Sequence, residues 1–420
     1  MYFAYSFCLF LGLLISAPWY FFRSRKYIGT IKPRLGYLEI PKLQGSIWIH
    51  AVSVGEVKTI HKLCSCLRVQ YPNRPLVLST TTPTGQQLAS ETRGLADYVF
   101  YFPFDLPGAV RRTLNHVNPR LMIIAETEIW PNFLRECRRR EIRTVLVNGR
   151  ISDRSFPRYQ MFRGWLKTIL QDFSILGMQS DTDRERIEYL GADPAKVRVL
   201  GNLKYDVSIS NRRADPVLAQ LLKQSSPLWI AASTTGSSGS PAHEEELVLN
   251  AFENLRKQHP NLKLLIAPRH PERFDTVEQL VRARGLECLR RTAISANESS
   301  ECFRDILLLD TIGELSSIFT FASVVFVGGS LVPRGGHNIL EPAAAARAIV
   351  IGPYMENFRE ISETFLSAGA AIQVRDADEL AKVVDRLICN PDETSQLGTG
   401  ARLIVERNTG ATQRVLPYLR

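Results

Sequence analysis

Short apolar runs alternate with stretches of helical pattern twice along this chain of 420 residues, and this double alternation restricts the fold more than any other feature. Such alternation is typical of parallel strands joined by crossover helices. In the first block the predicted strands are IWIHAVS, PLVLSTT, DYVFYF, LMIIAE, RTVLVN, SILGMQ and VRVLG. In the second block they are LWIAAS, KLLIAPR, DILLLD, SVVFVGG and AIVIGP. The predicted fold class is therefore α/β, with two Rossmann-like, doubly wound domains.

A polar stretch ending in proline, DVSISNRRADP, separates the two blocks and reads as a linker. The chain is also longer than the ~250–300 residues at which single cores stop growing. We predict a membrane anchor with a basic flank at residues 1–26 and a first α/β domain at 27–205. The linker is predicted at 206–216 and a second α/β domain at 217–420.

The amino-terminal segment, residues 2–22, is uncharged and about as long as the ~20 residues needed to span a bilayer. The basic residues follow this segment instead of preceding it, which favours an anchor that keeps both domains on the cytoplasmic side of the inner membrane. The alternative is a helix lying in the membrane interface. That alternative is suggested by the residues that dilute the apolar character: Ser6, Gly12, Ser16 and Pro18.

The formal net charge of +10 predicts an anionic partner, either nucleic acid, a phosphorylated substrate or an acidic lipid surface. Nucleic acid is disfavoured because the basic residues gather beside the apolar segment and at strand ends. Residues 155–170 interleave basic and aromatic side chains, as a membrane-surface helix or an ordinary crossover helix does. The 7 cysteines form no paired CxxC modules, which argues against a disulfide framework and a zinc cluster.

The segment HAVSVGE places Ser53, Gly55 and Glu56 directly after the first predicted strand, where ligands bind in open α/β sheets. Glycine permits close approach to the backbone, and a carboxylate there could take a proton from a hydroxyl nucleophile. The alternative role for Glu56 is a favourable interaction with the amino-terminal dipole of the following helix.

Further charged residues follow other strands of the first block. Glu126 and Glu128, in AETEIWPN, are two residues apart, so on a strand both carboxylates would share one face. Arg150 in NGRIS and Lys204 in GNLKYD supply cations suited to an anionic substrate. Each cation taken alone would normally be a solvated surface charge.

The second block carries features of a nucleotide site. The segment APRHPERF places basic residues after a strand, and DTIGEL opens a helix. The segment FVGGSLVPRGGHNILEP contains two glycine pairs, including Gly336 beside His337, and leads to a helix predicted to begin near Asn338. Glycine-rich turns before a helix present backbone N–H groups to phosphate, and Glu341 could accept hydrogen bonds from ribose hydroxyls.

No metal ion and no cofactor are predicted. The DxD patterns at residues 181–183 and 376–378 look like helix starts, and the histidines lack close partner spacing. Charge on a leaving group would then be stabilised by cations and helix dipoles. A nicotinamide oxidoreductase is disfavoured because no GxGxxG follows the first strand.

Taken together and in this order, the motifs resemble those of the 3-deoxy-D-manno-octulosonic acid (Kdo) transferases of lipopolysaccharide assembly. The motifs are HAVSVGE, TTPTG, YFPFDLP, ETEIWPN, NGRIS, GNLKYD, APRHPER, GELSSIF and GGHNILEP. The resemblance implies the glycosyltransferase-B architecture, with an acceptor-binding first domain and a CMP-Kdo-binding second domain. It implies inverting transfer of Kdo from CMP-Kdo, without metal, to a lipid A precursor (lipid IVA).

The resemblance also assigns roles to residues. It makes Glu56 the proton acceptor, and it makes Glu126 and Lys204 the groups that support the transition state. The residues it assigns to CMP are Pro268, Arg269, Ile312, Gly313, Glu314, Asn338, Ile339, Leu340 and Glu341. The loop at residues 234–246 is longer and richer in glycine and serine than the family pattern, which leaves the alignment of His243 and Glu244 open.

Two other function classes remain open from the sequence. Another nucleotide-sugar transferase or epimerase could share the same architecture. A membrane-tethered binding protein could use the site without chemistry.

Overall fold

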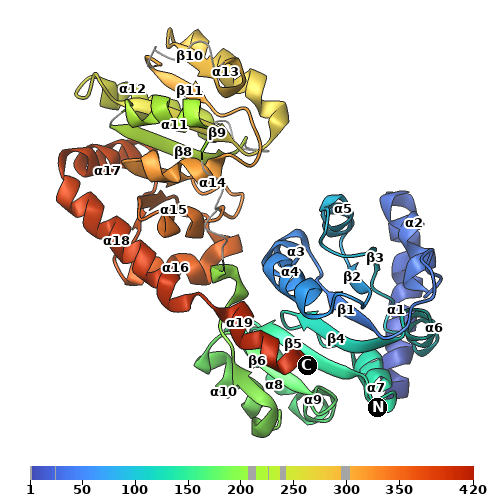
Figure 1. Ribbon diagram of the computed structural model, residues 1–420. Helices are drawn as coiled ribbons and strands as arrows, with labels where there is room; N and C mark the ends of the chain where they lie inside the picture. The colour runs from blue at the N-terminus through green and yellow to red at the C-terminus, as the bar shows by residue number, and fades with distance from the viewer. Residues whose placement is uncertain (1, 24, 207–213, 226, 237–242, 295–302) are drawn as a thin grey trace. The chain divides into compact units, whose positions relative to one another are not determined.

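The computed structural model describes residues 2–23, 25–206, 214–225, 227–236, 243–294 and 303–420. The chain forms two compact units, shown in Figure 1. Unit 1 comprises Met1–Asp206 and Asn408–Arg420, and unit 2 comprises Val207–Arg407. The predicted linker at 206–216 therefore lies at the boundary, although most of it falls outside the described residues.

Unit 1 is built on a seven-stranded sheet in the order β3-β2-β1-β4-β5-β6-β7. Its strands are parallel and match the predicted runs: β1 (Ser46–His50), β2 (Leu76–Thr80), β3 (Tyr98–Tyr101), β4 (Pro119–Ala125), β5 (Arg143–Gly149), β6 (Ile175–Met178) and β7 (Val197–Val199). The order reverses between β1 and β4, as in a doubly wound sheet.

The sheet of unit 1 is buried on both faces, which explains why its strands read as nearly continuous apolar runs. Trp48 in β1 and Met122 in β4 belong to one apolar cluster. Their neighbours Ile49 and Ile123, which pair across the two strands, belong to a second cluster on the opposite face. The alternation of side chains along each strand thus divides one apolar run between two cores.

Helices cover the sheet of unit 1 in the expected βα order (Figure 1). They are α1 (Tyr2–Arg23), α2 (Arg25–Arg34), α3 (Val54–Thr59), α4 (His61–Gln70), α5 (Pro83–Glu91), α6 (Pro107–Val117), α7 (Pro131–Arg139), α8 (Phe156–Met161), α9 (Arg163–Leu170) and α10 (Asp181–Tyr189). The first DxD pattern opens α10, as predicted, and the Ser180 side chain caps it.

The last residues of the chain return to unit 1, whereas the sequence pattern assigned them to the second domain. Asp206 accepts hydrogen bonds from the backbone N–H groups of Gly410 (2.6 Å) and Thr412 (2.5 Å). These bonds hold α19 (Ala411–Val415), whose apolar side chains join the core of unit 1. The red α19 in Figure 1 is therefore part of a domain that begins in blue.

The amino-terminal helix α1 packs against unit 1. The Ser6 hydroxyl accepts a hydrogen bond from Asn132 (2.9 Å), and the rings of Tyr5 and Trp165 lie 5.4 Å apart. Tyr5 also hydrogen-bonds to Asp105, a buried carboxylate that accepts the first N–H groups of α7. The expectation of a spanning segment is not confirmed, since no helix in the described part of the chain is both long and apolar enough to cross a membrane.

Unit 2 contains a second seven-stranded parallel sheet, in the order β10-β11-β9-β8-β12-β13-β14. Its strands are β8 (Leu228–Thr234), β9 (Lys263–Pro268), β10 (Cys288–Arg290), β11 (Ile306–Leu308), β12 (Val324–Val327), β13 (Ala348–Ile351) and β14 (Ile372–Gln373). The short edge strands β10 and β14 were not predicted. The strand order reverses between β8 and β12.

The helices of unit 2 enclose an apolar core that includes Trp229, Phe252 and Phe326. They are α11 (Pro216–Lys223), α12 (Glu244–Arg256), α13 (Phe274–Ala283), α14 (Leu315–Ile318), α15 (Leu340–Ala344), α16 (Arg359–Ser367), α17 (Ala377–Cys389) and α18 (Pro391–Asn408). The second DxD pattern opens α17, again as predicted, with Asp376 as its capping residue.

Candidate active site

The predicted acidic residues of unit 1 lie at the point where the strand order reverses. Glu56 follows β1 and Glu126 follows β4, and these two strands are neighbours at the centre of the sheet. The connections after them leave in opposite directions, which opens a crevice at the carboxyl ends of the strands. Both carboxylates therefore occupy the position where a doubly wound sheet binds its ligand.

Glu56 lies in the first turn of α3 and is nearly buried, with 8% of the residue exposed. Its Oε2 atom accepts a hydrogen bond from the Val52 N–H (2.7 Å), and its Oε1 atom accepts one from the Ser53 hydroxyl (3.1 Å). Burial, then the nearby charge of Glu126, raises the pKa of Glu56 to about 7. A carboxyl group with this pKa is matched to proton transfer near neutral pH.

Glu126 and Glu128 share the site, but not through strand alternation. Strand β4 ends at Ala125, and Glu126 adopts a left-handed conformation with φ of 59°. The Glu128 N–H then bonds to the Glu126 carbonyl (3.1 Å), which closes a turn. The prediction of a shared strand face was therefore wrong. Even so, burial and the charge of Glu126 raise the pKa of Glu128 to about 7, so the carboxylates are close.

Lys204 forms an ion pair with Glu126, with 3.4 Å between Nζ and Oε1. The segment that carries Lys204 is fixed by two asparagines: Asn148 Oδ1 accepts the Leu203 N–H, and Asn202 Oδ1 accepts the Lys204 N–H, both at 2.9 Å. The sequence pattern did not single out either asparagine as a site residue. In the structure Asn148 has a left-handed φ of 58°. A residue holds this conformation mainly where the surrounding structure enforces it, which marks Asn148 as a positioning residue.

The residues proposed as possible contributors in unit 1 have different positions. Ser53 contacts Glu56 directly, as described above. A Cβ atom at Gly55 would make only an ordinary contact with the Ser53 hydroxyl (3.9 Å). The close approach is instead at Gly85 of the TTPTG motif, where a Cβ atom would lie 3.2 Å from the Ser53 backbone. Arg150 donates its backbone N–H to the Thr127 hydroxyl (2.8 Å), which ties the end of β5 to the turn after β4.

In unit 2, the glycine turn after β12 binds an internal carboxylate. Glu244, fully buried at the start of α12, accepts the N–H groups of Gly329 (2.7 Å), Ser330 (3.1 Å) and Leu331 (3.0 Å). It also accepts the Thr235 N–H after β8 (3.1 Å). In this first glycine turn the N–H groups therefore face the Glu244 carboxylate instead of a phosphate. They join β8, β12 and α12 at the reversal point of the second sheet.

The basic residues after β9 differ in their exposure to solvent. Arg273 is partly buried and forms an ion pair with the buried Glu245 (3.0 Å), so it is part of the scaffold. Arg269 follows Pro268 and is exposed, while its backbone N–H bonds to the Thr234 carbonyl (2.8 Å). Among these cations Arg269 therefore presents its charge to solvent at the carboxyl edge of the sheet.

The second glycine pair needs glycine for steric reasons. Gly336 has φ of 72°, and a Cβ atom there would lie 2.2 Å from the Met355 sulfur. His337 follows and packs against Gly329. The Asn338 Oδ1 atom accepts the Leu340 N–H (3.0 Å), so the predicted helix begins two residues later, as α15. Ile339 and Leu340 are buried.

The Glu341 carboxylate accepts a hydrogen bond from Asn338 (3.0 Å) and is partly exposed near the start of α15. The other assigned group follows β11, on the β9 side of the sheet. There Gly313 has φ of 91°, Ile312 is 81% exposed, and Glu314 pairs with Arg291 (3.0 Å). Unit 2 thus gathers the assigned side chains at the carboxyl ends of β9, β11 and β12.

Comparison with known proteins identifies the family. Residues 29–207 match the family model for 3-deoxy-D-manno-octulosonic-acid transferase (kdotransferase). A 3-deoxy-D-manno-octulosonic acid transferase of Haemophilus influenzae is 36% identical over 95% of this chain and 92% of that protein. The chain belongs to the Kdo transferase family.

This Kdo transferase family member is thus a glycosyltransferase, and other relatives agree. The enzyme of the same name from Bordetella pertussis is 31% identical over 90% of this chain and 87% of its own length. Among solved structures, Acinetobacter baumannii MurG covers 90% of this chain and 99% of MurG, with a TM-score of 0.55 and 11% identity. The fold class of two parallel-sheet α/β domains of glycosyltransferase-B type is confirmed, apart from the anchor.

Proposed function

We propose that this protein transfers Kdo from CMP-Kdo to a lipid A precursor, lipid IVA, during lipopolysaccharide core assembly, with inversion at the anomeric carbon. Membership of the Kdo transferase family supports the donor sugar. The observation that carries the mechanism is Glu56, a nearly buried carboxyl group with a pKa of about 7 beside the Glu126–Lys204 pair. The alternative of a binding protein without chemistry gives no reason for such a group.

In the proposed reaction, Glu56 accepts the proton of an acceptor hydroxyl as its oxygen attacks the anomeric carbon of Kdo. The bond from that carbon to the phosphate oxygen breaks, and CMP leaves with the bonding electrons. The hydrogen bonds from Val52 and Ser53 orient the Glu56 carboxylate before the reaction. The Glu126–Lys204 pair supports the charge that moves in the transition state, because fixed charges cost little reorganisation.

We propose that the donor nucleotide binds at the carboxyl edge of the second sheet. The exposed Arg269 supplies positive charge for the phosphate, and Glu341 supplies an acceptor for ribose hydroxyls. The reaction is proposed to need no metal ion, with cations taking the charge of the leaving group. Activity of the purified enzyme should then be unchanged in excess chelator, and full loss restored by Mg²⁺ would contradict this part of the proposal.

The test of the base is Glu56→Gln, measured with purified protein, CMP-Kdo and lipid IVA and with mass spectrometry of the lipid product. Loss of a general base lowers kcat by about 10²–10⁴-fold. The matched control is Glu185→Gln, an exposed acid on α10 of the same unit, which should retain full activity. Undiminished transfer by Glu56→Gln would overturn the base assignment, and a product from a UDP-sugar instead of CMP-Kdo would overturn the donor.

We also propose that α1 contacts an anionic membrane surface on the cytoplasmic side of the inner membrane. Tyr5 and Ser6 join α1 to the rest of unit 1, and Phe3, Phe7 and Phe10 line an open pocket with Leu106 and Ala109. The apolar side chains of α1 that share helical spacing remain at least 48% exposed: Phe3, Phe7, Phe10, Leu14 and Ile15. An apolar stripe of this kind, beside the basic α2, favours insertion into the interface between headgroups and acyl chains.

The membrane proposal is tested by flotation with vesicles of zwitterionic or anionic phospholipid. The double variant Phe7→Ser/Phe10→Ser should reduce vesicle binding strongly, because each aromatic ring contributes about 1.5–3 kcal/mol when buried. Transfer to a detergent-dispersed acceptor should be retained, which separates membrane contact from chemistry. Equal flotation of wild type and variant with the vesicles would contradict the proposal.

A further inference from the structure

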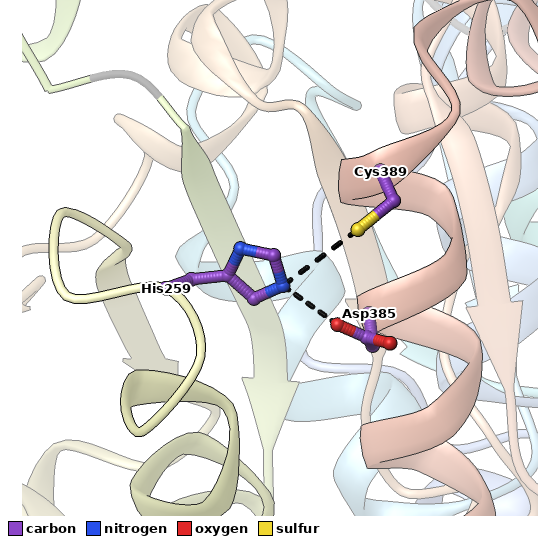
Figure 2. Close-up of side chains that lie close together, drawn as sticks. All are labelled: His259, Asp385 and Cys389. Carbon is purple, nitrogen blue, oxygen red and sulfur yellow. Dashed lines mark hydrogen bonds and ion pairs between the residues drawn. The ribbon is translucent and has the colours of Figure 1, made fainter.

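Unit 2 carries a cluster of three potential metal ligands that the proposed transfer reaction does not use. His259 lies in the turn after α12, and Asp385 and Cys389 lie one turn apart on α17. Figure 2 shows the three side chains converging, with both α17 groups directed at the imidazole. The i, i+4 spacing places Asp385 and Cys389 on the same face of the helix.

We propose that His259, Asp385 and Cys389 bind a Zn²⁺ ion. The His259 Nε2 atom lies 2.6 Å from Asp385 Oδ1 and 3.9 Å from Cys389 Sγ. All three ligand atoms lie within 4.8 Å of one another. Around tetrahedral zinc, with bonds of about 2.0–2.3 Å, ligand atoms are separated by about 3.3–3.8 Å. Small side-chain rotations therefore suffice to centre an ion.

The types of ligand select the metal. A thiolate and an imidazole favour zinc and similar transition metals, whereas Mg²⁺ and Ca²⁺ prefer oxygen ligands throughout. On binding, the Cys389 thiol loses its proton to solvent and Nε2 of His259 must be unprotonated, so one thiol proton is released per ion. Cys389 is exposed, so a water molecule can complete the tetrahedron.

A metal ion at this site would link the end of α12 to α17, two helices that already pack together. Helices α12 and α17 meet through apolar side chains that include Val248, Phe252 and Val384. The metal would fix the carboxyl end of α12, whose amino end carries Glu244 and the bonds to the glycine turn. Because the ion binds only the folded arrangement, it adds stability to unit 2.

The experiment uses the full-length protein stripped with a chelator and titrated with Co²⁺ and then Zn²⁺. Cobalt bound to a thiolate gives a near-ultraviolet charge-transfer band, which zinc should remove by displacement. We expect one metal ion per chain, with the band lost in Cys389→Ser and metal affinity reduced at least about tenfold in His259→Gln and Asp385→Asn. The control Cys66→Ser, in α4 of unit 1, removes a different thiol and should keep the band.

Thermal unfolding provides the second measurement and separates metal loss from misfolding. In chelator, wild type and variants should unfold at similar temperatures. Added zinc should raise the unfolding temperature of wild type and Cys66→Ser but not of Cys389→Ser. The proposal is overturned if wild type shows no thiolate band, or if the band survives in Cys389→Ser and disappears in Cys66→Ser.

Discussion

At the scale of single residues, the protonation of Glu56 after β1 depends on the two acids after β4. The charge of Glu128 adds to the burial and the Glu126 charge that raise the pKa of Glu56. A base must be unprotonated to act, so kcat/KM should rise with pH and level off above about 7.

Replacing Glu128 tests this coupling. In Glu128→Gln one negative charge is removed, the pKa of Glu56 falls, and the acidic limb of the pH profile should move to lower pH. The measurement is kcat/KM between pH 5 and 9 for wild type and variant. An acidic limb that stays in place would contradict the coupling between Glu128 and Glu56.

The same raised pKa has a consequence for stability. The pKa of Glu56 is about 7 folded against 4.5 unfolded, so the folded state holds more protons between these values and loses stability as pH rises through 7. Glu56→Gln should therefore increase the free energy of unfolding at pH 8 by about 1–3 kcal/mol. The gain in the free energy of unfolding should vanish below pH 4.5. Denaturant titrations of wild type and variant at pH 8 and below pH 4.5 measure this difference.

At the scale of elements, the buried Glu244 joins the start of α12 to the glycine turn. In Glu244→Ala four backbone N–H groups lose their acceptor, at a cost of about 1–3 kcal/mol for each group left unsatisfied. The protein should unfold at much lower denaturant concentration and bind CMP weakly. The control is Glu253→Ala, further along α12, and equal stability of the two variants would contradict this role.

The elements also show how far the sequence could be read. Apolar runs predicted the central strands because those strands are buried on both faces. Strands β10 and β14 have three and two residues, too few for a periodic pattern. The internal use of the glycine turn could not be predicted, because Glu244 lies 85 residues before Gly329. Likewise, no spacing rule connects His259 with Asp385.

At the scale of the whole molecule, the chain leaves unit 1 after Asp206 and returns to it at Asn408. The alternation of strand and helix patterns could not indicate this return, because the final segment is short and its partners are distant in the sequence. Removal of residues 409–420 should expose the partners of Ala411, Val415 and Leu419, all of which are buried in unit 1.

Each large apolar side chain contributes about 1.5–3 kcal/mol to the free energy of unfolding when it is buried. The truncated protein should therefore lose several kcal/mol of stability in unit 1. Hydrogen exchange should speed up in β4 and β5, while the strands of unit 2 keep their protection. Removing Arg420 alone serves as the control. Unchanged exchange after the larger deletion would contradict the importance of the returning segment.

The returning segment also determines the order of events during synthesis. Unit 2 is continuous in sequence, whereas unit 1 also needs residues 408–420, which are translated after the whole of unit 2. The carboxylate of Asp206 has its backbone partners Gly410 and Thr412 only after the whole of unit 2 has been translated. Synthesis of the domain that carries Glu56 therefore begins before unit 2 and is completed after it.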